Sequence, residues 1–329
     1  MIVDCHMHVF ERMTGYPPEL WGTPLDLGRA ALHGMSSVRG SEGVVAPGTL
    51  EERPSPYLWN GFQPHARVVQ RIPPCPGTTA FPAEVALAYM DMVGVQKAFL
   101  MQGPAYGRQN RYFAEVVYQW PDRFVGFADV DWSKGKKAAA DLERWIVYEG
   151  LRGCKVEVPC IKAAYPAFSV LGENEMRVWE MCEQLGAPIV FHLEHGEGPC
   201  EEIRSLLAHF PKLLLIIAHL GAPPVNPSWR EQSLLAKHDR VFLEISALPF
   251  EFREEEYPFP GAQECIRWAV SEIGAEKMMW GSDAPSLLVW CTYEQMLNLV
   301  RTKCSFLSDE QRRLILGGTA EQLLMSLPS

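Results

Sequence analysis

The stretch Met1–Phe10, MIVDCHMHVF, decides the fold, because an apolar strand begins the chain and ends in two histidines. Successive side chains alternate across a strand, so Asp4, His6 and His8 are expected to share one face while Cys5 points away. Two neutral imidazoles that project the same way suit one metal ion. Asp4 lies one layer deeper and could either orient a ligand or form ordinary buried hydrogen bonds.

Seven further apolar runs follow at intervals and end, like the first, in polar or small residues. Some are almost continuously apolar, such as LLLIIAHL, which is typical of parallel strands buried on both faces. Helical patterns such as NEMRVWEMCEQLG, with a glycine suited to end a helix, separate them. The eight runs are Ile2–Val9, Val93–Gln102, Arg123–Val130, Leu151–Val158, Ala187–Glu194, Leu213–Leu220, Val241–Leu248 and Lys277–Ala284. The order predicts an α/β protein with a (β/α)8 TIM barrel as a single domain over residues 1–329.

The main irregularity is the long segment 10–80, which is rich in proline and glycine and shows little periodicity. An insertion after the first strand of a barrel would lie at the catalytic mouth, where it could serve as a lid or pocket wall. The alternative is a surface loop without a functional role. Its aromatic residues could also form a homodimer interface.

Composition indicates which kinds of partner the protein binds and in which cellular compartment it is expected. The chain has 329 residues, of which 47% are hydrophobic and 21% charged, as in a soluble globular protein. No run approaches the roughly 18 apolar residues of a membrane helix, and no secretory signal is visible. Nine cysteines without paired spacing indicate reduced thiols in a cytoplasmic protein. A net charge of −10 without a basic block argues against a nucleic-acid partner, but it says little about the substrate, which is expected to be a small molecule.

Polar groups recur where the predicted strands end. The carboxyl ends of parallel barrel strands converge on one mouth, so groups far apart in sequence would meet there. A single buried histidine or aspartate is more often a satisfied core residue than a ligand, but recurrence at the same structural position favours a joint site. The metal-competent residues at these positions are His6, His8, His192, His219 and Asp283, with Lys155 in the fourth strand.

Several motifs resemble those of the amidohydrolase superfamily. They are DCHMH at the start, VFH in the fifth strand, AHLGAP in the sixth, GSDAP in the eighth and ILGGTAEQLL near the end. The chain is most similar to the branch that contains aminocarboxymuconate-semialdehyde decarboxylase and related decarboxylases and hydrolases. The resemblance covers most of the chain and is weakest over residues 10–80. Thr319 stands where many relatives carry asparagine.

The resemblance implies that His6, His8, His192 and Asp283 bind one divalent metal ion, with zinc as the first expectation and manganese as the second. It also implies that His219 stands beside the metal-bound water. The residue types agree with this, because three imidazoles and a carboxylate leave a position open for water. Asp283 could ligate and accept the proton of the attacking water, and His219 could polarise a carbonyl or move a proton.

Three residues are candidates for contact with the substrate. Lys155 could bind a substrate carboxylate, bridge two metal ions after carboxylation as in binuclear relatives, or pair with an acid such as Glu157. Arg108 could bind an anionic substrate or remain solvated, and His195 is expected at the pocket rim. Glu244 could line the barrel or pair within it.

The first functional hypothesis is a metal-dependent hydrolase, in which activated water attacks a lactone, ester or amide carbonyl of a small compound that could carry a carboxylate. The alternative is non-oxidative decarboxylation of an aromatic or unsaturated carboxylic acid at the same site. A barrel that has lost catalysis and only binds a ligand is the third hypothesis, which the intact ligand set disfavours. Both enzymatic hypotheses depend on analogy for the reaction type.

Overall fold

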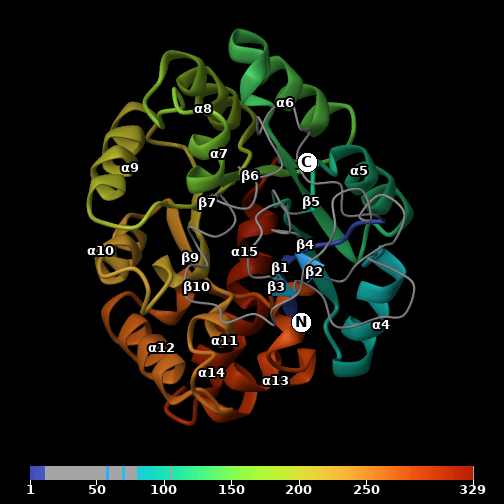
Figure 1. The fold of residues 1–329 in the computed structure, drawn as a ribbon, viewed down its shortest axis with the longest axis vertical. Helices are drawn as coiled ribbons and strands as arrows, with labels where there is room; N and C mark the ends of the chain where they lie inside the picture. Colours follow the sequence, from blue (N-terminus) through green and yellow to red (C-terminus); the bar gives the residue numbers. More distant parts are fainter. Residues whose placement is uncertain (12–56, 59–68, 71–79, 104–105, 329) are drawn as a thin grey trace, which may run out of the picture.

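The computed structural model describes residues 1–11, 57–58, 69–70, 80–103 and 106–328 (Figure 1). Eight parallel strands form one sheet in chain order, as the sequence predicts. They are β1 (Val3–Met7), β4 (Lys97–Leu100), β5 (Phe124–Asp129), β6 (Gly153–Glu157), β7 (Ile189–His192), β8 (Leu215–Ile217), β9 (Val241–Ile245) and β10 (Met278–Trp280). Each lies within one of the eight apolar runs.

The first and last strands meet at a seam that closes the sheet into a cylinder. Met7 forms a parallel bridge with Ala284, and the amide of His8 donates to the carbonyl of Ala284 at 2.8 Å. One step deeper, the amide of Asp283 donates to the carbonyl of His6 at 2.7 Å. The fold is therefore a (β/α)8 barrel, and its seam joins the two ends of the chain beside the predicted site.

Helices surround the strands as an outer ring, except for α15, which lies across the end of the cylinder (Figure 1). They are α4 (Ala83–Val93), α5 (Asn110–Gln119), α6 (Ala138–Val147), α7 (Val158–Ala164), α8 (Glu173–Leu185), α9 (Gly198–His209), α10 (Trp229–Leu234), α11 (Leu248–Glu251), α12 (Pro260–Glu272), α13 (Tyr293–Asn298), α14 (Asp309–Arg313) and α15 (Thr319–Ser326). The predicted helix NEMRVWEMCEQLG is α8, which ends at Gly186 with a φ of 63°. That left-handed conformation is the one for which glycine is favoured at a helix end.

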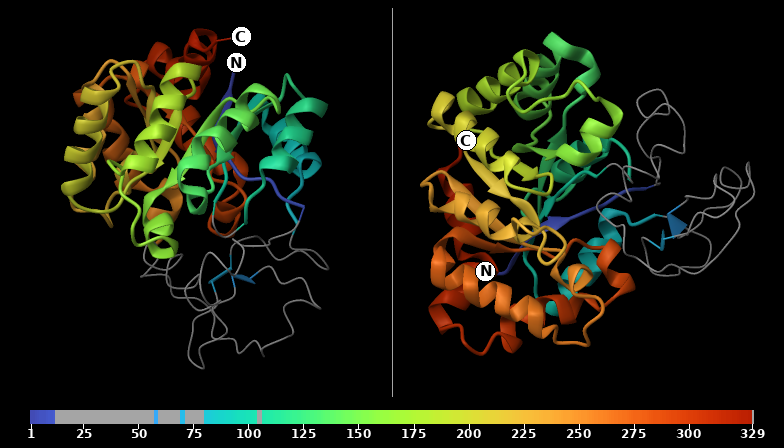
Figure 2. Two further views of the ribbon diagram at one scale, coloured as in Figure 1. Left: turned by 90° about the horizontal axis from the view of Figure 1, so that it is seen from above. Right: turned by 60° about the vertical axis from the view of Figure 1, so that its left-hand side comes forward.

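Two layers of apolar side chains hold the barrel together. One layer packs between strands and helices, and the other fills the cylinder. The inner layer takes alternate residues from the strands, for example Phe99 and Met101, and includes Ala320 and Leu323 of α15. Helix α15 therefore plugs the amino-terminal end of the cylinder and leaves the carboxyl end for the site. The N-terminus lies beside α15, with its amino group 3.7 Å from Glu321 (Figure 2).

Most of segment 10–80 lies outside the described residues, so its role as a lid stays a prediction. Within it, β2 (Tyr57–Leu58) and β3 (Val69–Gln70) form a short antiparallel pair. The single-domain assignment over residues 1–329 also stays a prediction. None of the described helices is both long and apolar enough to cross a bilayer.

Candidate metal centre

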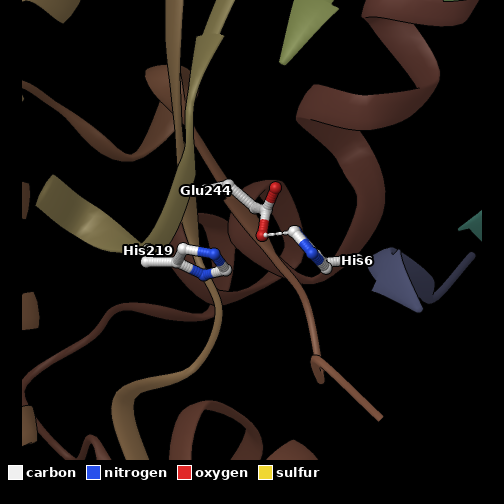
Figure 3. Close-up of side chains that lie close together, drawn as sticks. All are labelled: His6, His219 and Glu244. Carbon is white, nitrogen blue, oxygen red and sulfur yellow. Dashed lines mark ion pairs between the residues drawn. The ribbon is translucent and has the colours of Figure 1, made fainter. Parts of the chain in front are cut away.

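The carboxyl ends of the strands bring the predicted polar residues to one end of the cylinder. Figure 3 shows His6, His219 and Glu244 pointing toward one another from three separate parts of the chain. The polar side chains at this end are His6 from β1 and His8 just after it, Lys155 and Glu157 from β6, His192 from β7, His219 after β8, Glu244 from β9 and Ser246 just after it, and Asp283 after β10.

His8 and Asp283 form a contact that needs a cation or a proton between them. Nδ1 of His8 lies 2.7 Å from the carbonyl oxygen of Met101, which can only accept, so Nδ1 carries the proton. A neutral His8 then turns the lone pair of Nε2 toward Oδ1 of Asp283, which lies 2.9 Å away. Two acceptors at this distance repel each other unless a positive charge lies between them.

His6 stands between two carboxyl groups. Its Nε2 lies 3.7 Å from Oδ1 of Asp283, and its Nδ1 lies 2.7 Å from Oε1 of Glu244. Neither ring nitrogen has a hydrogen bond of acceptable alignment within the described residues, although both are buried. The contact with Glu244 is thus close but poorly aligned. A buried polar group without a partner costs free energy, so these orphaned atoms indicate a site for a missing group.

His219 and Asp283 both adopt left-handed backbone conformations. Their φ values are 58° and 56°, and Leu220 and Ala222 beside His219 have φ values of 52° and 64°. Such conformations cost on the order of 1–3 kcal/mol for residues other than glycine and cluster at functional sites. They end the strands abruptly and place both side chains across the mouth.

Burial keeps the histidines neutral. It lowers the pKa of His6 and of His219 well below the ordinary value, with additional effects of Lys155 on His6 and of neighbouring His6 on His219. Burial also lowers the pKa of His192 to about 4. At neutral pH these imidazoles therefore carry lone pairs that a metal ion can use.

Asp283 and Glu244 differ in the direction in which the site shifts their pKa values. Burial acts to raise the pKa of Asp283, but the hydrogen bond with His8 and the nearby ring of His6 outweigh it, and the net pKa is lowered. Burial raises the pKa of Glu244 to about 8. Of these two carboxyl groups, Asp283 is thus the one that remains ionised at neutral pH without a metal ion.

Lys155 carries a buried ammonium group next to the candidate ligands. Its Nζ lies 3.7 Å from Oε1 of Glu157 and has no hydrogen bond within the described part of the chain. Burial acts to raise the pKa of Glu157, but Lys155 opposes it and the net pKa is lowered. The arrangement agrees with the predicted pairing of Lys155 with Glu157 and leaves the ammonium able to accept a further partner.

His192 lies at the end of β7, where the sequence places it, but outside the groups of closely spaced ligand atoms. Its ring lies 4.9 Å from that of His219, measured between centroids. Two groups of described residues have ligand atoms within 4.8 Å of one another: His6, His8 and Asp283, and His6, His219 and Glu244. His192 belongs to neither group, so its role as a metal ligand stays a prediction.

The two outer substrate candidates lie apart from this cluster. The guanidinium of Arg108 lies between two acids, with Nε 3.1 Å from Asp129 and Nη1 3.1 Å from Asp131. Its charge is therefore engaged within the protein. His195 is exposed just beyond β7, and partial burial lowers its pKa. Contact of either residue with a substrate stays a prediction.

The prediction that Asp4 shares a face with the two histidines is wrong. The pairing of β1 with β4 shifts between Asp4 and Met7, which reverses the alternation of side chains. Cys5 therefore packs in the inner layer rather than away from it. Asp4 points into the seam, where it accepts hydrogen bonds from the amide of Ser282 at 2.8 Å and the hydroxyl of Tyr293 at 2.7 Å.

Ser246 and Tyr293 are the contributors that sequence reasoning missed. Ser246 follows Glu244 by two residues, so the alternation of a strand could have placed both on one face. No comparable signal links Tyr293 to Asp4, because the two are 289 residues apart.

The residues fit a divalent ion. His6 and His8 can offer Nε2 and Asp283 can offer Oδ1, which are ligand types that zinc and manganese both accept. The close contact of Nε2 of His8 with Oδ1 of Asp283 and the orphaned Nε2 of His6 are the structural observations behind this fit.

Comparison with known proteins agrees with this fold. The family model described as Amidohydrolase matches residues 3–325, and the chain belongs to this family. The family resemblance expected from the sequence is thereby confirmed.

Individual relatives are more distant. The chain is 25% identical over 139 residues to the L-fucono-1,5-lactonase of Burkholderia multivorans, which is 38% of this chain and 47% of that protein. The match thus spans about half the length of this curated relative.

Two solved structures illustrate the range of the fold. An amidohydrolase of B. multivorans with bound zinc is 18% identical, covers 100% of both chains and has a TM-score of 0.66. A dihydroxybenzoic acid decarboxylase from Polaromonas with bound manganese is 18% identical, with 75% of this chain and 87% of that chain covered and a TM-score of 0.55. At this identity the likeness establishes the fold alone.

Proposed function

We propose that this chain is a metal-dependent hydrolase that opens a lactone, or cleaves an ester or amide, of a small compound that can carry a carboxylate. The observation that carries the proposal is the position of Asp283. Its Oδ1 faces Nε2 of both His8 and His6, at 2.9 and 3.7 Å. The partial match to a lactonase supports lactones as the first substrate class to test.

The chain's own residues divide the work between binding and proton transfer. His6, His8 and Asp283 would hold the ion. When bound, the ion supplies positive charge that acidifies water and polarises a carbonyl group. Asp283 stays ionised and accepts a proton from the attacking water as the new carbon–oxygen bond forms. That proton passes to the leaving oxygen or nitrogen as the old bond breaks, and His219 is placed to assist.

Decarboxylation at the same site is the second candidate. The observation that favours it is the buried ammonium of Lys155, which has no hydrogen bond within the described residues. An ammonium in this position could bind the carboxylate that leaves as carbon dioxide. It could also donate the proton that replaces that group on carbon.

A substrate screen on zinc-loaded and manganese-loaded protein tests the proposal. Proton release from 1,4- and 1,5-aldonolactones and aryl esters, and amine release from amides, measure hydrolysis. Carbon dioxide release from aromatic acids measures decarboxylation. We expect lactone opening that is lost on chelation and restored by the metal. The Asp283→Asn variant should lose turnover; full activity in that variant, or in metal-free protein, would refute the proposal. Carbon dioxide release without any hydrolysis would select the second candidate.

A further inference from the structure

Two side chains at the carboxyl end of β9 reach the site although the proposed reaction gives neither a role. Glu244 and Ser246 are two residues apart, so both point to the same side of the strand, and both are fully buried. Neither belongs to the predicted ligand set. Their contacts run to a proposed metal ligand on one side and to His219 on the other.

The contact with His219 fixes which of its nitrogens carries the proton. The hydroxyl of Ser246 donates its hydrogen bond to Oε1 of Glu244. The same hydroxyl oxygen lies 2.7 Å from Nδ1 of His219, and because its proton is already engaged it can only accept there. Nδ1 of His219 is therefore protonated, and Nε2 is left with the lone pair.

The contact of Glu244 with His6 also favours a proton on Nδ1 of the ring. Oε1 of Glu244 lies 2.7 Å from Nδ1 of His6. Because this oxygen already accepts the hydroxyl proton of Ser246, it faces Nδ1 of His6 as an acceptor, which favours a proton on Nδ1 and leaves Nε2 free on the side of Asp283. Metal-binding histidines commonly have such a carboxylate behind them, where it sets ring orientation and ligand strength.

We propose that Glu244 and Ser246 are positioning residues that select the Nδ1-protonated tautomers of His6 and His219 together. One oxygen of Glu244 is the shared point, since it contacts His6 directly and His219 through Ser246. The inference rests on the proposed metal site, because the tautomer of His6 matters only if its Nε2 binds the ion. The shared oxygen of Glu244 thus couples His6, a proposed ligand, to His219, the residue that would assist proton transfer.

Long-range proton–nitrogen NMR spectra of the full-length protein, with ¹⁵N-histidine, test this directly. They distinguish the two tautomers of each ring, and single His→Gln variants assign the signals of His6 and His219. We expect Nδ1–H for both rings in the zinc-loaded protein, and for His219 also without metal. A Nε2–H signature for His219 would overturn the proposal.

Variants separate the contact of Ser246 with His219 from the contact of Glu244 with His6. Ser246→Ala should release His219 into a mixture of tautomers while His6 keeps its own, and Ser246→Thr should restore the wild-type signature. Thr319→Val is the matched control, because it also removes one buried hydroxyl, which donates to the carbonyl of Ala275 at 3.4 Å. Both histidine signatures should be unchanged in it. An unchanged His219 signature in Ser246→Ala would overturn the proposal.

Zinc affinity tests the contact of Glu244 with His6. Glu244→Gln should weaken zinc binding by roughly 10- to 100-fold, and Ser246→Ala should leave it nearly unchanged. Equal affinity of Glu244→Gln and wild type would overturn the proposed role of Glu244, and so would complete loss of zinc, which would make Glu244 a ligand. If wild-type protein binds no zinc, the proposed function fails, whereas the tautomers of His219 still decide its link to Ser246.

Discussion

Replacing Tyr293 with phenylalanine tests the seam that holds the first and last strands together. The Tyr293 hydroxyl donates to Oδ2 of Asp4 at 2.7 Å, and both groups are buried. Burial raises the pKa of Asp4 from 3.8 to about 6, although hydrogen bonds from Ser282, Tyr293 and the His6 amide partly oppose it. Asp4 is therefore neutral in the folded protein at pH 4.5 and ionised at pH 8.

The sign of the pH effect follows from this raised pKa. Ionisation of Asp4 costs stability as pH rises from 3.8 through about 6, on the order of 3 kcal/mol in all. The Tyr293 hydrogen bond reduces that cost, because it stabilises the charged form. A hydrogen bond to a charged group contributes about 1.5–3 kcal/mol and one between neutral groups about 1 kcal/mol. Tyr293→Phe should therefore lose about 2–3 kcal/mol at pH 8 but only about 1 kcal/mol at pH 4.5.

Urea unfolding of metal-free protein, followed by circular dichroism at both pH values, measures the two losses. The phenylalanine ring keeps the packing against Trp280, so only the hydroxyl is removed. Tyr118→Phe is the matched control, since the side chain of Tyr118 is 90% exposed, and it should change stability at neither pH. Equal losses at both pH values for Tyr293→Phe would refute the account of Asp4 as a buried carboxyl group that depends on Tyr293.

Three other substitutions probe the site and the barrel separately. A Cβ atom at Gly281 would lie 2.8 Å from Cβ of His6. Gly281→Ala should therefore displace His6 and weaken zinc binding about tenfold or more, as measured by competition with a chelator. Unchanged zinc affinity would contradict the role of His6 as a ligand. A Cβ atom at Gly153 would lie 2.7 Å from the ring of Phe127. Gly153→Ala should therefore lower the stability of the barrel by about 1–3 kcal/mol in thermal melts, while the folded protein keeps its zinc affinity. Loss of zinc binding in this variant would contradict the separation of barrel packing from the metal site. Lys155→Met should raise KM about tenfold for carboxylated substrates and leave neutral ones unaffected, whereas equal effects on both would exclude carboxylate binding.

Much of the barrel could be predicted because its local signals agree with its tertiary structure. Runs such as Leu213–Leu220 are apolar because both faces of the strand are covered, and that leaves a clear mark on the sequence. Their ends could not be predicted as well. Strand β8 stops at Ile217, because His219 and Leu220 adopt left-handed conformations that no periodic pattern predicts.

The candidate site was predictable as a set of residues but not as a set of contacts. His6, His8, His219 and Asp283 do meet at the mouth, since strand ends converge there. The face of Asp4 was predicted wrongly, because the shift in β1 arises from its pairing with β4, which is more than 90 residues away. Such irregularities depend on the partner strand rather than on local sequence.

The most direct test of the central claim is the position of zinc in crystals of the zinc-loaded protein, located by anomalous scattering at the zinc edge. The account predicts one strong peak about 2.0–2.2 Å from Nε2 of His6, Nε2 of His8 and an oxygen of Asp283. A peak held by Glu244 and His219 instead, or none at the mouth of the barrel, would contradict it.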